Sequence, residues 1–167
     1  MTRLERRLET RLGIEEAFAF VADFANAMHW DPGVATSESA SDGPVGVGKR
    51  YRLGVRLGSR VSSMDYRITA FEAPRLVVLA GEGSGVTATD EIRFTPSATG
   101  TAIDYVADIR LGGLLRIAQP FLGKQFASLA SNAVDGMRAT LDARADANAA
   151  AMAGSADGTP SPGTPGA

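Results

Sequence analysis

The chain has 167 residues, of which 44% are hydrophobic and 22% charged, and its formal net charge is −2. These values are typical of one globular domain that can bury its own core. The absence of cysteine excludes disulfide scaffolds, thiolate zinc sites and cysteine nucleophiles, and a single histidine excludes histidine-based metal clusters. The charge gives no general affinity for nucleic acid, and we expect no metal or cofactor.

The N-terminal segment predicts a strand followed by two short helices. Charged and apolar residues alternate over residues 2–12, a period typical of a half-buried strand, and Gly13 ends it. Apolar residues at helical spacing then predict helix over residues 14–28, which Pro32 terminates. The charged start argues against a signal peptide and no apolar run is long enough to span a membrane, so we expect a cytoplasmic protein.

Between Val34 and Leu111 the pattern changes to short strands separated by glycine- and proline-containing turns. No helical pattern interrupts them, so they predict an antiparallel meander. One face of each strand is apolar and the other charged, as expected for a sheet with one face in water. The charged face mixes arginine with aspartate, which favours a solvated surface over a nucleic-acid site.

A long helix is predicted after Gly112 and Gly113, because apolar residues recur there at steps of three and four. Pro120 predicts a kink near its start, and the helix continues to about residue 150. Residues 151–167 are rich in glycine, proline, serine and threonine towards their end, and we expect them to be a disordered tail. The folded domain is therefore predicted to span residues 1–150.

Eight short motifs follow one another along the chain: Phe20–Phe24, Trp30–Val34, Gly43–Gly48 leading into Tyr51, Phe71–Arg75, Asp90–Pro96, Gly100–Thr101, Tyr105 and Leu111–Gly113. In this order they resemble the motifs of the START and birch-pollen-allergen superfamily, also called SRPBCC. The chain is most similar to its polyketide cyclase/dehydrase and lipid-transport-like branch. The resemblance covers roughly residues 1 to 145.

The resemblance implies an α+β helix-grip fold, in which a curved seven-stranded antiparallel sheet wraps around a long C-terminal helix. Two short helices follow the first strand. It also implies a cavity between sheet and helix, where family members hold lipids, polyketides or other hydrophobic molecules. We therefore expect a soluble binding protein for a small hydrophobic ligand. Two alternatives stay open: a polyketide cyclase/dehydratase that uses aspartate and tyrosine residues of the cavity, and a co-chaperone-like interaction module.

Asp90 is the most informative candidate site residue, because its strand phase places a carboxylate among inward-facing apolar residues. It could act as a general acid or base, or anchor a polar group of the ligand. The structural alternative is an aspartate bonded to backbone N–H groups. The other predicted lining residues are Trp30, Tyr51, Leu53, Val55, Met64, Tyr66, Ile68, Ile92, Phe94, Tyr105, Leu122, Phe126 and Leu129.

Three other features have a structural interpretation. The glycines of Gly43-x-x-x-x-Gly48-Lys49 resemble the start of a phosphate-binding loop, but a strand follows and Arg50 replaces the Ser or Thr that coordinates magnesium. Trp30 is expected to anchor the core, with a place at the cavity mouth as the alternative. His29 has no evident catalytic partner, so we expect it to lie at a helix end and not to act as a general base.

Overall fold

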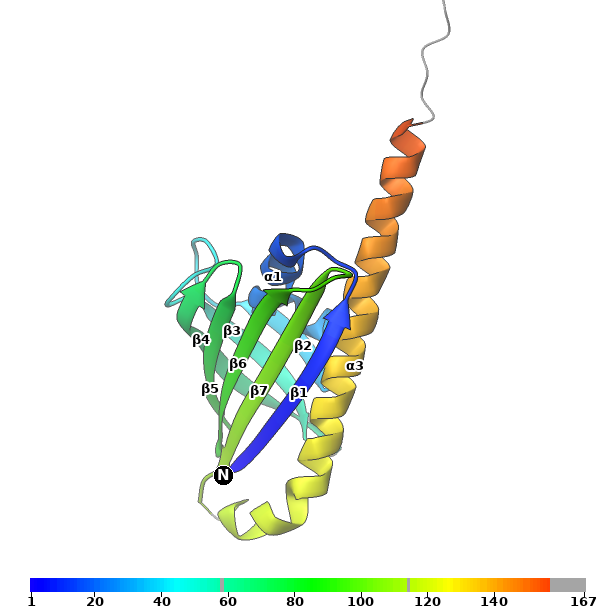
Figure 1. The fold of residues 1–167 in the computed structure, drawn as a ribbon. Helices are drawn as coiled ribbons and strands as arrows, with labels where there is room; N and C mark the ends of the chain where they lie inside the picture. Colours follow the sequence, from blue (N-terminus) through cyan, green and yellow to red (C-terminus); the bar gives the residue numbers. More distant parts are fainter. Residues whose placement is uncertain (58, 114, 157–167) are drawn as a thin grey trace, which may run out of the picture.

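The computed structural model describes residues 1–57, 59–113 and 115–156, leaving out the side chains of residues 57, 115–127, 129, 130 and 156. Seven antiparallel strands form one curved sheet, and a long helix packs along it (Figure 1). The elements in chain order are β1 (Thr2–Thr10), α1 (Ile14–Ala22), the short 3-10 helix η1 (Phe24–Asn26), α2 (Ala27–Trp30), β2 (Val34–Ser39), β3 (Arg50–Leu57), β4 (Arg60–Glu72), β5 (Leu76–Gly83), β6 (Val86–Pro96), β7 (Thr101–Leu111) and α3 (Leu115–Ala156).

The strands are ordered β1-β7-β6-β5-β4-β3-β2, so β2 to β7 form a meander and β1 pairs with the last strand. Leu8 of β1 lies opposite Ile103 of β7, and both side chains are buried in the core. This architecture confirms the predicted helix-grip fold, including the helical segments between β1 and β2.

Alternation along the strands produces the two faces of the sheet. In β6 every second residue from Val86 to Phe94 is buried. On the outward face, Arg52 pairs with Asp65 at 2.9 Å and Arg7 with Asp104 at 2.8 Å. Exposed pairs of this kind contribute little stability, so the sheet is stabilised mainly by its inner, apolar face.

Aromatic side chains from α1 and η1 fill one half of the concave face. The ring of Phe18 lies 5.2 Å from those of Phe71 and Phe94. Phe24 packs edge-to-face against Trp30 at 5.8 Å and lies 5.6 Å from the ring of Tyr66. Contacts at these distances are favourable beyond simple burial. This half of the sheet is therefore solid core.

Helix α3 crosses the other half and makes its main contacts with β1 and α2. Asp142 accepts hydrogen bonds from the Thr10 hydroxyl at 2.8 Å and the Arg11 backbone N–H at 3.0 Å. Near the middle of α3, a Cβ added to Gly136 would lie 2.4 Å from the Trp30 carbonyl oxygen. Glycine at this position therefore allows α3 to approach α2 closely.

The two ends of α3 bear on the sequence predictions. Its first turns lie at an angle to the rest of the helix (Figure 1), as the proline near its start predicts. At the other end α3 continues to Ala156, so residues 151–156 are helical and do not belong to the predicted disordered tail. Several alanines with high helix propensity extend the helix past the sheet, where residues 146–155 are exposed. Residues 157–167 lie outside the described part of the chain.

Gly136→Ala should destabilise the protein by about 1–3 kcal/mol, because the new methyl group overlaps backbone that cannot move aside freely. Helix propensity alone would change stability in the opposite direction, by about 1 kcal/mol. Gly154→Ala is the matched control, since a Cβ there meets nothing within 4 Å. Urea unfolding of both variants measures the difference. A Gly136→Ala protein as stable as its parent would contradict the close helix contact.

Candidate functional site

A cavity of about 110 Å³ lies in the half of the concave face that the aromatic core does not fill. Small inward-facing residues, Ala88 on β6 and Ala107 on β7, leave this space, and Ala133 of α3 borders it. Larger apolar side chains complete the walls, among them Leu4, Val55, Met64, Val86 and Ile109.

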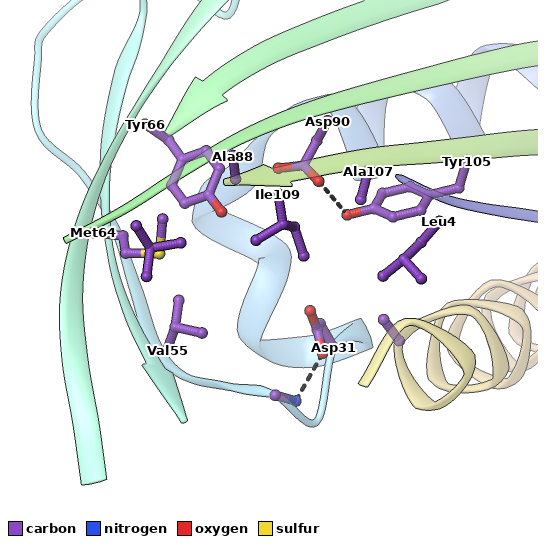
Figure 2. A pocket seen from close by; sticks show the side chains of 13 residues that line it. Leu4, Asp31, Val55, Met64, Tyr66, Ala88, Asp90, Tyr105, Ala107 and Ile109 are labelled. Atoms are coloured by element: carbon purple, nitrogen blue, oxygen red, sulfur yellow. Dashed lines mark hydrogen bonds between the residues drawn. The ribbon is translucent and has the colours of Figure 1, made fainter. Parts of the chain in front are cut away.

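A carboxyl group and two phenols converge on the sheet side of the cavity (Figure 2). Asp90 of β6 is only 4% exposed, and its Oδ1 accepts a hydrogen bond of 2.7 Å from the Tyr105 hydroxyl. Tyr66 of β4 points its hydroxyl towards Asp90 from the other side. Tyr66 can lie flat along the sheet because Gly81 is beside it: a Cβ there would be 2.5 Å from the ring.

A second carboxyl group enters the cavity from the opposite wall. Asp31 follows α2 directly, and its Oδ1 accepts a hydrogen bond of 2.7 Å from the Gly33 backbone N–H. This turn orients the side chain inward, so that Asp31 faces the strands that carry Asp90 and Tyr105 (Figure 2). The Gly33 carbonyl in turn accepts a bond of 2.8 Å from the Arg56 N–H, which attaches the turn to β3.

Both carboxyl groups hold their protons more tightly than an ordinary aspartate. Burial raises the pKa of Asp90 to about 6; the Tyr105 hydrogen bond opposes this shift, and the negative charge of Asp31 adds to it. Burial also raises the pKa of Asp31 to about 6, against the effect of the Gly33 N–H. Burial raises the pKa of Tyr66 and Tyr105 well above the usual value, so both phenols remain protonated donors.

The structure divides the residues predicted to line a ligand site into three groups. Cavity residues are Val55, Met64, Tyr66, Asp90 and Tyr105. A second group is buried in the core and does not line the cavity: Trp30, Tyr51, Leu53, Ile68, Ile92 and Phe94. Trp30 belongs to α2 itself, and the other five lie on the part of the sheet that α1, η1 and α2 cover. The third group is Leu122, Phe126 and Leu129, whose side chains lie outside the described part of the chain.

The sequence analysis did not identify Asp31 as a site residue, although it lies within the Trp30–Val34 motif. The available signal was the Asp-Pro-Gly turn at a helix end, since such turns fix the aspartate side chain on their own backbone. His29 itself is exposed, and its carbonyl oxygen accepts a bond of 3.0 Å from the Thr140 hydroxyl. In the described residues no three histidine, aspartate or glutamate side chains gather as a metal ion would require.

A comparison with protein families identifies the family of this chain. A family model described as polyketide cyclase/dehydrase and lipid transport matches residues 1–146. The chain belongs to this family. No curated protein matches it. Of the helices described here, none has both the length and the apolar character needed to cross a bilayer.

Solved structures share the fold of this family member at low sequence identity. The Zhui aromatase/cyclase from a Streptomyces species has a TM-score of 0.70 and 11% identity, over 88% of this chain and 94% of that one. A START superfamily protein from Mycobacterium smegmatis has a TM-score of 0.68 and 12% identity, over 89% and 99% of the two chains. At these identities the likeness shows the fold alone.

Asp90→Asn should flatten the pH dependence of stability. The pKa of Asp90 is about 6 in the folded protein, against an ordinary value of 3.8, so the folded state binds the proton more tightly than the unfolded state. The contribution of wild-type Asp90 to the free energy of unfolding therefore decreases as pH rises from about 4 to about 6. Relative to wild type, the variant's free energy of unfolding should therefore increase by about 2–3 kcal/mol from about pH 4 to pH 7.

Denaturant unfolding at several pH values measures this difference. Asp65→Asn is the control, because that carboxylate is exposed on the outer face beside Arg52. A relative stability of Asp90→Asn that stays flat, or falls as pH rises, would show that Asp90 is not buried as described.

Proposed function

We propose that the protein binds a small, mostly apolar molecule in the cavity, with its polar end held by Asp31, Tyr66, Asp90 and Tyr105. The observation that carries this proposal is an apolar cavity on which four polar side chains converge from separate elements. Ligand sites characteristically combine apolar walls with a few placed polar groups. Membership of a family described by polyketide conversion and lipid transport supports the same function.

The volume of the cavity restricts the ligand. At about 110 Å³ it is of the order of the engineered cavity of about 150 Å³ that holds benzene. With α3 in its present position, the space therefore accommodates one ring or a short chain. A longer lipid or polyketide chain would enter only if α3 moved away from the sheet.

Ala107→Leu should abolish binding of a one-ring probe, because the larger side chain fills the cavity. Benzyl alcohol is a suitable probe, and its binding can be followed by methyl chemical shifts and by calorimetry. Ala150→Leu on the exposed part of α3 is the control and should bind as wild type does. Equal binding to both variants would place the probe elsewhere. No binding to any of the three proteins would favour the interaction-module alternative.

The buried carboxyl of Asp90 also favours a second function, acid–base catalysis on a polyketide-like substrate. A carboxyl with a pKa near 6 can both take and return a proton close to neutral pH. Asp90 would accept a proton from a carbon between two carbonyl groups. The Tyr66 hydroxyl would donate a hydrogen bond to the enolate oxygen that forms, while the Tyr105 hydroxyl stays bonded to Asp90 Oδ1.

This second function predicts that Asp90→Asn eliminates turnover of a poly-β-keto thioester and weakens benzyl alcohol binding far less. A loss of at least about a hundredfold is expected for removal of a general base. Mass spectrometry of the cyclised or dehydrated product measures it, with Asp65→Asn as the charge-matched control. Undiminished turnover by Asp90→Asn would exclude this residue as the base.

A further inference from the structure

The two carboxyl groups give the cavity a surplus of hydrogen-bond acceptors. Asp90 already accepts from Tyr105 through Oδ1, and Asp31 accepts from Gly33 through Oδ1. No donor in the described residues is hydrogen-bonded to the second oxygen of Asp31, which is oriented into the cavity (Figure 2). A ligand therefore meets carboxylate oxygens on two opposite walls.

The described part of the lining contains no cation that offsets these carboxylates. None of the described lining residues is a lysine, an arginine or a histidine. Arg6 on the neighbouring β1 directs its guanidinium elsewhere, to the Ser131 hydroxyl at 3.3 Å and the Glu5 carbonyl at 2.8 Å. Two like charges inside an apolar cavity are unfavourable, and one cation between them would be attracted to both.

The other polar groups of the site allow the same kind of ligand. Three polar side chains face Asp90: Tyr66 from β4, Tyr105 from β7 and, across the cavity, Asp31. On β5 the residue opposite Asp90 is the apolar Leu79. The phenol oxygens can accept hydrogen bonds as well as donate them. An ammonium group carries three donors, which suits this set of acceptors.

We infer that the cavity selects a small apolar molecule that carries a protonated amine, held between Asp31 and Asp90 with its apolar part against Met64, Val55 and Ile109. This inference rests on the proposed binding function and specifies its ligand class. A carboxylate ligand would instead direct negatively charged oxygen atoms against the two carboxylates and be disfavoured at neutral pH.

Three probes of nearly equal shape test the inference: benzylamine, benzyl alcohol and benzoate. Measured by calorimetry on the full chain at about pH 8, where both aspartates are ionised, benzylamine should bind at least about tenfold more tightly than benzyl alcohol. Benzoate should not bind. Equal binding of benzylamine and benzyl alcohol, or preferred binding of benzoate, would overturn the amine inference and leave the proposed binding function standing. Failure of all three probes would count against the binding function itself.

Variants assign the preference to the two carboxyl groups. Asp31→Asn should lower the affinity for benzylamine much more than the affinity for benzyl alcohol, and so remove most of the preference, whereas Asp65→Asn should leave both affinities unchanged. Asp31 is the first choice because it is less deeply buried than Asp90, and Asp90→Asn provides the second variant. A preference that survives both substitutions would show that the pair does not recognise the amine.

The pH dependence gives an independent reading. From about pH 8 to pH 5 benzylamine stays protonated, while both aspartates gain protons and lose their charge. Benzylamine affinity should therefore fall over this range, and benzyl alcohol affinity should change little. An affinity for benzylamine that rises with acidification would contradict recognition by carboxylates.

Discussion

The close contact between α3 and α2 determines the shape of the functional half of this protein. Gly136 allows the α3 backbone to reach the Trp30 carbonyl, and the bond from Thr140 to the His29 carbonyl secures the same junction. The turn that carries Asp31 begins at this junction, so the position of α3 also sets the position of one cavity wall. A larger separation would open the cavity to water and weaken the electrostatic interaction between its two carboxyl groups.

The buried carboxyl groups oppose the stability that the rest of the sheet provides. Asp90 and Asp31 are shifted mainly by burial, which means that folding disfavours their charged forms. Apolar side chains at the same positions could extend the core without this cost, as they do at Ile92 and Leu79. A destabilising polar group retained in a cavity is characteristic of a site that interacts with a ligand or reacts with one.

The sequence predicted the sheet and the inward phase of Tyr66, Asp90 and Tyr105 because side chains alternate strictly along a strand. It did not distinguish Tyr51 or Ile92, which share that phase, from the cavity residues. The distinction depends on which part of the sheet α1 and η1 cover, and long-range packing decides this. Asp31 lies in a turn, where no periodicity reveals the direction of a side chain. The end of α3 was misplaced because alanine-rich helix continues without an apolar stripe.

Binding and catalysis make different demands on the same four polar side chains. A proton-transferring site needs Asp90 ionised so that it can accept the substrate proton and later return it, with Asp31 neutral beside it. Both pKa values lie near 6, the charge of Asp31 raises the cost of ionising Asp90, and an uncharged substrate leaves this balance unchanged. An amine ligand stabilises both charges at once and removes the proton needed for acid catalysis. The charge of the molecule that enters the cavity therefore decides whether the two carboxyl groups act as a counter-ion site or Asp90 acts as a general acid and base.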